Sequence, residues 1–130
     1  MKTFLVDTNA ILRFLLGDVP SQFRLIKAKV NEVKIGKLKL VVPEIIFFES
    51  YFTLTSHYNY SKEKVLVALE SLASSNYFEV ENRDFILKGL KIFKSANLSF
   101  VDSYLASRSG IEGYDIFTFD KKLEKYAKSS

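Results

Sequence analysis

The most informative segment of the chain is Thr3-Phe4-Leu5-Val6-Asp7-Thr8-Asn9, an apolar run of strand type that ends in polar residues. A helical pattern follows, so Asp7 is expected at the carboxyl end of a buried strand. The run Ile116-Phe117-Thr118-Phe119 leads in the same way into Asp120 and a helix opening. Ligands of open α/β sheets bind outside the carboxyl ends of the strands, so both aspartates are candidates to face one crevice. Alternatively, each is a helix N-cap, a position that Asp favours.

A third acid, Glu49, lies in a helix predicted to begin near Pro43. Its neighbours at helical spacing are Ile45, Ile46 and Phe52, so the carboxylate is expected to share an apolar face. A carboxylate in such a setting is costly unless it is paired, protonated or bound to a metal.

Asp102 has a similar setting, in a helix that Gly110 is expected to end. Leu105 and Ala106 follow it by one helical turn, so it is expected to face inward. Scattered over the whole length, the four acids are candidate parts of one metal site: Asp7, Glu49, Asp102 and Asp120.

Strands and helices are expected to alternate along the chain. The predicted strands cover residues 3–6, 38–42, 77–80 and 116–119. The predicted helices cover residues 10–16, 21–36 and 43–58, then begin at about Ser61, Asn82, Leu98 and Lys121. Strands separated by helices imply an α/β fold with a mainly parallel sheet covered on both faces. With 130 residues and no internal repeat, one domain over residues 1–130 is expected.

Composition narrows the chemistry of the site. The chain has no cysteine, which excludes disulfides, thiolate catalysis and sulfur-ligated zinc. Its one histidine, His57, is expected at the end of a helix, as a dipole partner or a surface residue rather than a general base. Clustered carboxylates without histidine or cysteine suit Mg²⁺ or Mn²⁺.

The formal net charge is +4, and gathering four acids in one pocket would leave a net charge of +8 on the rest of the molecule. Such a surface could attract a polyanion to the rim of the pocket. Alternatively, the fifteen lysines are a solvated surface that keeps the protein soluble. No apolar run of membrane-spanning length and no signal pattern is present, so the expectation is a cytoplasmic protein without membrane contact.

Four fragments together resemble the PIN-domain family, and within it the ribonuclease toxins of VapBC toxin–antitoxin systems. The fragments are Val6-Asp7-Thr8-Asn9, Val42-Pro43-Glu44 leading to Glu49, Phe100-Val101-Asp102 and Thr118-Phe119-Asp120. The stretch from Arg13 to Asp18 also looks like the one that follows the first aspartate in such toxins. Each fragment is short, but their order and spacing cover nearly the whole chain.

The resemblance implies an α/β/α sandwich whose acids meet at the carboxyl edge of the sheet and bind Mg²⁺ or Mn²⁺. By position, Asp7, Glu49, Asp102 and Asp120 would form the acidic site. Asp7 and Asp102 are the first choice for direct ligands, and Asn9 and Thr118 would give polar support. The expected reaction is hydrolysis of single-stranded RNA to a 5′-phosphate and a 3′-hydroxyl, with the metal activating water and stabilising charge.

The resemblance also implies two protein partners. One is an antitoxin whose C-terminal segment would lie along a groove and place a basic side chain near the acids. The other is a second copy of the chain, and the aromatic density around Phe47, Phe48, Tyr51 and Phe52 is compatible with such interfaces. Packing in the core is the alternative for most of these aromatics.

Two rival functions remain open. A phosphatase or a receiver-type phosphoacceptor also binds Mg²⁺ at strand ends, but it would need a second acid where this chain has Asn9. An inactive PIN-fold module that binds RNA or protein would have no evident use for four retained carboxylates. Asp115 is expected at the sheet edge opposite Asp120, and Arg13 is expected to contact a phosphate, a carboxylate or solvent.

Overall fold

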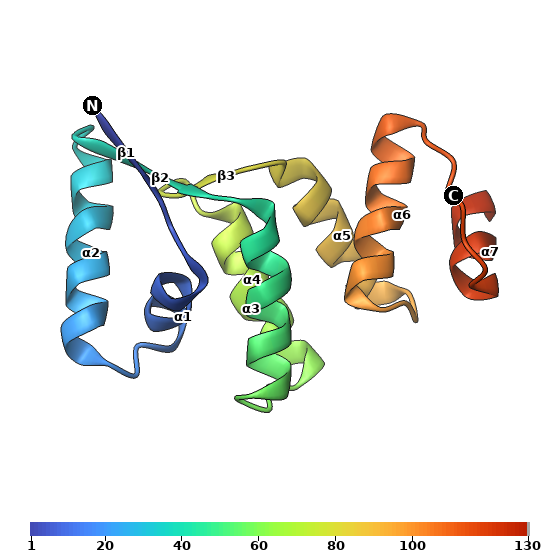
Figure 1. Ribbon diagram of the computed structural model, residues 1–130, viewed down its shortest axis with the longest axis horizontal. Helices are drawn as coiled ribbons and strands as arrows, with labels where there is room; N and C mark the ends of the chain where they lie inside the picture. The colour runs from blue at the N-terminus through green and yellow to red at the C-terminus, as the bar shows by residue number, and fades with distance from the viewer. Residues whose placement is uncertain (130) are drawn as a thin grey trace. The chain divides into compact units, whose positions relative to one another are not determined.

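The computed structural model describes residues 1–129, which form parts of two compact units, Met1–Glu81 and Asn82–Ser130 (Figure 1). The elements of the first unit are β1 (Lys2–Leu5), α1 (Thr8–Leu16), α2 (Pro20–Lys34), β2 (Leu38–Val42), α3 (Glu44–Ser56), α4 (Lys62–Ser74) and β3 (Glu79–Val80). Those of the second are α5 (Arg83–Ser95), α6 (Phe100–Glu112) and α7 (Lys121–Ser129).

The three strands form a parallel sheet in the order β1-β2-β3, with Leu5 opposite Val41 and Val42 opposite Val80. The strand predicted over 38–42 is confirmed, the first strand lies one residue earlier than predicted, and the third is shortened to two residues. The predicted α/β class with a parallel sheet is therefore confirmed.

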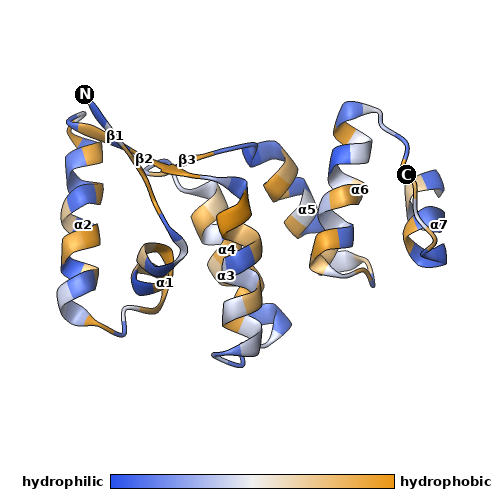
Figure 2. Ribbon diagram, viewed as in Figure 1, coloured by the Kyte–Doolittle hydropathy of each residue, from blue (hydrophilic) through white to orange (hydrophobic). Residues whose placement is uncertain are grey.

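In the first unit, α1, α2, α3 and α4 lie on one side of the strands (Figure 1). Both connections run from one parallel strand to its next neighbour in the same direction, and right-handed crossovers of this kind place their helices on the same face. That face buries alternate strand residues, namely Val6, Leu38, Leu40, Val42 and Val80. Much of the length of the strands is accordingly orange in the hydropathy view (Figure 2).

The second unit is helical, with α5 packed on α6 and α6 packed on α7. One of its buried clusters consists of Ile92, Leu98, Ala106 and Leu123, against which Ile116 and Tyr126 pack. No helix in residues 1–129 combines the length and the apolar character needed to cross a membrane.

The strand predicted over residues 116–119 is wrong, because the described structure contains no strand there. Phe117 and Phe119 are 92% and 91% exposed, while Ile116 packs against the core of the second unit. A strand needs a neighbouring strand for its backbone hydrogen bonds, and the described residues of this unit contain none. The apolar run that suggested a strand therefore lies in a segment without regular secondary structure.

Helix starts agree with the sequence in part. The predicted start of a helix at about Ser61 is confirmed, because Ser61 caps α4 and accepts a hydrogen bond from the backbone N–H of Lys64 at 3.2 Å. The helix predicted over 21–36 begins one residue earlier, because Val19 is the N-cap and Pro20 is the first helical residue. Proline suits that position, since its φ angle is already helical and its missing N–H would have no partner there.

Gly110 does not end α6, contrary to the prediction. The helix continues to Glu112, and Gly113 ends it in the left-handed region at φ 70°. Gly113 N–H donates to the carbonyl oxygen of Ser109. A residue without Cβ adopts this conformation without strain, which is why the later glycine is the terminator.

The two glycines should respond in opposite ways to alanine. Gly110→Ala is expected to stabilise the protein by about 0.5–1 kcal/mol, because alanine is the better residue inside a helix. The new methyl group would meet only the flexible end of Lys88. Gly113→Ala is expected to destabilise by about 1 kcal/mol or more, because its φ is positive. Urea unfolding measures both, and equal shifts in the two variants would contradict this account.

Candidate functional site

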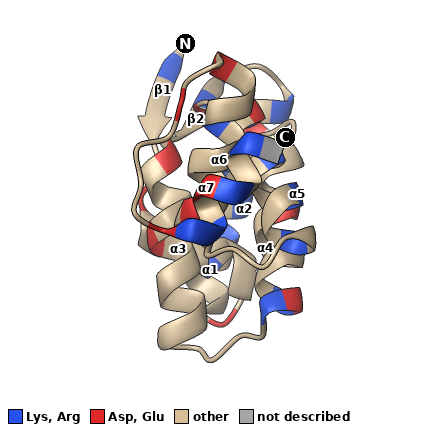
Figure 3. Cartoon of the chain, turned by 90° about the vertical axis from the view of Figure 1, so that its right-hand side faces the viewer, with Lys and Arg blue, Asp and Glu red and all other residues tan. Residues whose placement is uncertain are grey.

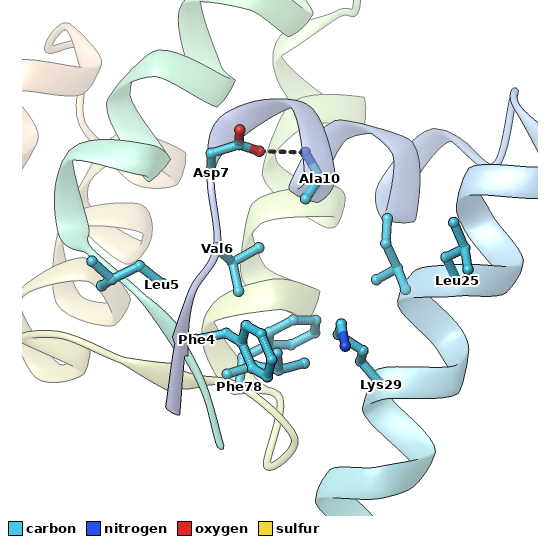
Figure 4. Close-up of a pocket in the computed structure, with 10 residues that line it drawn as sticks. Phe4, Leu5, Val6, Asp7, Ala10, Leu25, Lys29 and Phe78 are labelled. Atoms are coloured by element: carbon cyan, nitrogen blue, oxygen red, sulfur yellow. Dashed lines mark hydrogen bonds between the residues drawn. The ribbon is translucent and has the colours of Figure 1, made fainter. Parts of the chain in front are cut away.

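Asp7 lies directly after β1, as predicted. The ladder continues through Val6, whose N–H donates to the carbonyl oxygen of Val41 at 2.9 Å. Asp7 is also the N-cap of α1, and its Oδ1 accepts a hydrogen bond from the N–H of Ala10 at 2.9 Å (Figure 4). The two readings of this aspartate are therefore compatible, because the cap holds one carboxylate oxygen and leaves the other for a ligand.

Glu49 lies in the second turn of α3, and its side chain is exposed. The expected burial of its face is wrong, because Ile45 and Phe52 are 65% and 51% exposed. The buried face of α3 consists instead of Phe47, Ser50 and Leu54. Glu49 therefore presents its carboxylate to solvent in this unit, without the desolvation cost that an apolar burial would impose.

The first unit brings the elements that carry Asp7 and Glu49 to one edge of its sheet. Leu5 and Val41 are paired in a parallel register, so Asp7 follows β1 where α3 begins after β2. Helix α1, which Asp7 caps, packs against α3. Glu49 lies roughly 7.5 Å further along the axis of α3 than Glu44.

Asp102 is half-buried in the first turn of α6. Ser99 caps this helix, with its Oγ accepting a hydrogen bond from Asp102 N–H at 3.1 Å. The positive end of the helix dipole favours a carboxylate at this position. The prediction that Asp102 faces inward is confirmed only in part. Of its neighbours one turn later, Ala106 is buried, while Leu105 is 40% exposed.

Asp120 caps α7 in the same way that Asp7 caps α1. Its Oδ1 accepts a hydrogen bond from Leu123 N–H at 3.0 Å, and its own N–H donates to Thr118 Oγ1 at 3.0 Å. Thr118 thus stabilises the turn that precedes Asp120. The reason for the position differs from the prediction, since Asp120 follows a segment without regular secondary structure and not a strand.

Of the four acids, Asp7 and Glu49 belong to the first unit and Asp102 and Asp120 to the second. Residues 1–129 contain no group of three or more Asp, Glu, His or Cys side chains arranged to hold a metal ion. Each unit contains two of the four predicted acids. For the part of the chain that is described, neither Glu49 nor Asp102 makes a side-chain hydrogen bond or an ion pair.

Two hydroxyl groups next to the acids are unusual, and the sequence analysis missed them. Thr8 follows Asp7 and Ser50 follows Glu49, and both Oγ atoms are buried without a hydrogen-bond partner among the described residues. Buried polar groups normally have partners, so these two can serve a water or a ligand oxygen. The signal in the sequence was a hydroxyl residue directly after each acid.

Arg13 forms a hydrogen bond and an ion pair within the first unit. Its Nη2 donates to the hydroxyl of Tyr58 at 2.7 Å, and its Nη1 lies 3.1 Å from Asp18 Oδ2. The hydrogen bond to Tyr58 and the charge of Asp18 raise the pKa of Arg13. The salt-bridge role left open by the sequence is therefore the one observed, and the guanidinium ties α1 to the segment after α3.

Three further polar residues considered in the sequence analysis lie exposed on the surface. His57 is the exposed C-cap of α3, as predicted, and its ring contacts that of Tyr58. Asn9 is exposed on α1, and Asp115 is exposed between α6 and α7. Because no strand forms over 116–119, the prediction that Asp115 lies at the opposite end of such a strand is wrong.

An apolar groove of about 350 Å³ runs beside β1 in the first unit. Phe4 and Val6 line it from the strand and Leu25 lines it from α2, with Lys29 and Asp7 among its polar residues (Figure 4). The side chain of Leu5 points to the other side of the strand (Figure 4). The groove thus connects a lysine with the predicted site residue Asp7.

Comparison with known proteins agrees with this picture. Residues 4–129 match the PIN domain family. The chain is also similar to a VapC ribonuclease of Aquifex aeolicus (strain VF5), with 27% identity over 124 residues, which cover 93% of this chain and 90% of that protein. No solved structure gives a significant match. The resemblance to the PIN-domain family and the predicted α/β fold class with a parallel sheet are thereby confirmed. Cover on both faces, which was also predicted, is not seen within the first unit, where all four helices lie on one side of the strands.

Proposed function

The chain belongs to the PIN domain family, and we propose that it is a metal-dependent endoribonuclease that acts as the toxin of a toxin–antitoxin pair. The observation that carries this proposal is the family match over residues 4–129, which includes all four predicted acids. The similarity to a ribonuclease over nearly the whole of both chains supports it. In this proposal Asp7, Glu49, Asp102 and Asp120 act together as one acidic site.

The chemistry of these residues fits a hard divalent cation. Mg²⁺ usually binds through one or two carboxylates and keeps several waters, so even the pair from one unit suits it. The carboxylates of Glu49 and Asp102 have no competing partner in the described part of the chain. Asp7 and Asp102 are proposed as direct ligands of Mg²⁺ or Mn²⁺, and Glu49 and Asp120 as ligands directly or through water.

The local structure gives each side chain a defined task. Backbone N–H groups of Ala10 and Leu123 hold one oxygen of Asp7 and Asp120, which fixes the orientation of each carboxylate. Thr118 holds the turn before Asp120, and the exposed amide of Asn9 is available to a phosphate oxygen. When bound, the cation would activate water and stabilise charge on the phosphodiester.

The proposed substrate is single-stranded RNA, cleaved to a 5′-phosphate and a 3′-hydroxyl. The formal net charge of +4, in a chain whose four acids are proposed to share one site, supports a polyanionic substrate. A carboxylate–metal site can cleave RNA or DNA. The proposal of RNA as the substrate therefore rests on the similarity to a ribonuclease.

The proposed protein partner is an antitoxin segment that lies along the groove beside β1. An extended or helical segment with apolar side chains would fit Phe4, Val6 and Leu25. Because the groove reaches Asp7, a basic side chain at the end of that segment could pair with the acid and compete with the cation.

A homodimer is a further prediction. The exposed face of α3 that carries Ile45 and Phe52 is apolar, which is typical of protein interfaces. Organisation as a single domain over residues 1–130 and a cytoplasmic location also stay predictions.

The test is cleavage of a labelled single-stranded oligoribonucleotide by the purified chain. Cleavage is expected with Mg²⁺ or Mn²⁺, to be absent in excess chelator and to return when metal is restored, with no phosphorylated protein formed. A phosphoprotein intermediate would indicate the phosphoacceptor chemistry. RNA binding without cleavage under any of these metals would indicate an inactive binding module.

A further inference from the structure

The second unit contains a hollow of about 460 Å³ that the proposed acidic site does not use. Five residues of α5 and one of α7 line it: Leu87, Lys88, Lys91, Ile92, Ser95 and Tyr126. Ile92 is buried and Leu87 and Tyr126 are half-buried, whereas both lysines are exposed. The hollow therefore combines an apolar base with a cationic rim.

The two lysines are placed to act together. Lys88 and Lys91 are three residues apart on α5, which puts them on neighbouring turns of one helix face, roughly 5–6 Å apart at Cβ. Neither ammonium group forms an ion pair or a hydrogen bond with another residue in residues 1–129. By contrast, Lys128 on α7 pairs with Glu124 at 3.1 Å. Among the described residues, none therefore neutralises the positive charge at the hollow.

The net charge of the second unit is also positive. Residues 82–130 contain nine Lys and Arg against six Asp and Glu, a net charge of +3, whereas residues 1–81 contain ten against nine. Most of the net positive charge thus belongs to the second unit, and blue segments mark the lysines of α5 and α7 (Figure 3). A ligand attracted to this unit is expected to be an anion.

Apolar side chains next to unpaired lysines are suited to bind single-stranded nucleic acid, which offers both phosphates and exposed bases. Sequence-tolerant binding of single strands uses cationic groups for successive phosphates and apolar or aromatic surface for the bases. The ring of Tyr126 and the side chain of Leu87 supply such surface, and two ammonium groups one turn apart suit neighbouring phosphates.

We propose that this hollow is a binding subsite for the single-stranded RNA substrate, with Lys88 and Lys91 each contacting a phosphate. The inference rests on the proposed ribonuclease function. It adds a positioning surface to that function, and the two lysines take no part in bond cleavage.

The test is RNA binding measured apart from cleavage. Fluorescence anisotropy of a labelled single-stranded oligoribonucleotide in chelator reports affinity without turnover. The double variant Lys88→Gln, Lys91→Gln is expected to bind roughly 25-fold more weakly at 0.1 M salt, because each lost phosphate contact removes about 0.7 from the slope of log K against log salt. That slope should therefore fall by about 1.4. Glutamine is a good helix former, so α5 should keep its stability.

The matched control is Lys37→Gln, Lys94→Gln, which removes the same charge from two exposed lysines outside the hollow. It is expected to keep the wild-type slope. Equal losses in both double variants would overturn the proposal, since net charge alone would then explain binding. Unchanged RNA affinity of the hollow variant would also overturn it, including the case in which that variant binds an antitoxin more weakly. RNA binding that depends on the hollow in a chain that cannot cleave would leave the subsite standing and remove the ribonuclease function.

Discussion

Replacing Asp7 or Asp102 by asparagine is expected to lower metal-dependent RNA cleavage on the order of 10³-fold while the fold is retained. A bound cation supplies several kcal/mol of transition-state stabilisation, and each 1.36 kcal/mol is a factor of ten in rate. Asparagine keeps an oxygen that can cap α1, so the hydrogen bond from Ala10 N–H survives in Asp7→Asn. Cleavage rates and urea unfolding of the two variants measure the two effects separately.

The matched control is Asp115→Asn, which removes an exposed acid outside the proposed site. It should cleave RNA at the wild-type rate. Wild-type cleavage by Asp7→Asn or by Asp102→Asn would remove the proposed mechanism. Equal losses in all three variants would assign the effect to net charge.

Asp120 allows the role of helix cap to be separated from that of ligand. Asparagine preserves the acceptor for Leu123 N–H, whereas alanine removes it at a cost of about 1 kcal/mol. If Asp120 binds metal, Asp120→Asn loses cleavage with little change in stability. If it only caps α7, Asp120→Asn stays active and only Asp120→Ala loses stability.

Phe47→Ala is expected to destabilise the protein by about 3–5 kcal/mol, a large share of the stability of a small domain. Phe47 is fully buried on the inner face of α3, so its removal loses apolar burial and leaves a cavity. Thermal or urea unfolding of the purified variants measures this, and poor yield of folded protein is the extreme form of the same result.

Phe52→Ala is the control from the same helix. Its side chain is 51% exposed, so the expected loss is within about 1 kcal/mol. Equal destabilisation of the two variants would show that α3 buries both faces in solution. That outcome would contradict the assignment of Phe47, Ser50 and Leu54 as its buried face.

The sequence alone determined the local order of the fold and narrowed the ligand chemistry of the predicted site. The run into Asp7 predicted a strand followed by a helix, and the strand over 38–42 was predicted to the residue. The absence of cysteine and the single histidine already pointed to oxygen ligands. These features depend on residue type and short-range periodicity, which a sequence displays directly.

Only the tertiary structure decided which helix faces are buried and which segments pair as strands. Apolar residues stand on several sides of α3, so its periodicity could not show that Phe47 is buried while Ile45 and Phe52 are exposed. The segment over 116–119 is an apolar run like that of a strand, but a strand forms only where another strand accepts its hydrogen bonds. Whether Lys88 and Lys91 stay unpaired also depends on chain that is distant in sequence. Burial, pairing and unpaired charge are long-range properties, and the folded chain alone determines them.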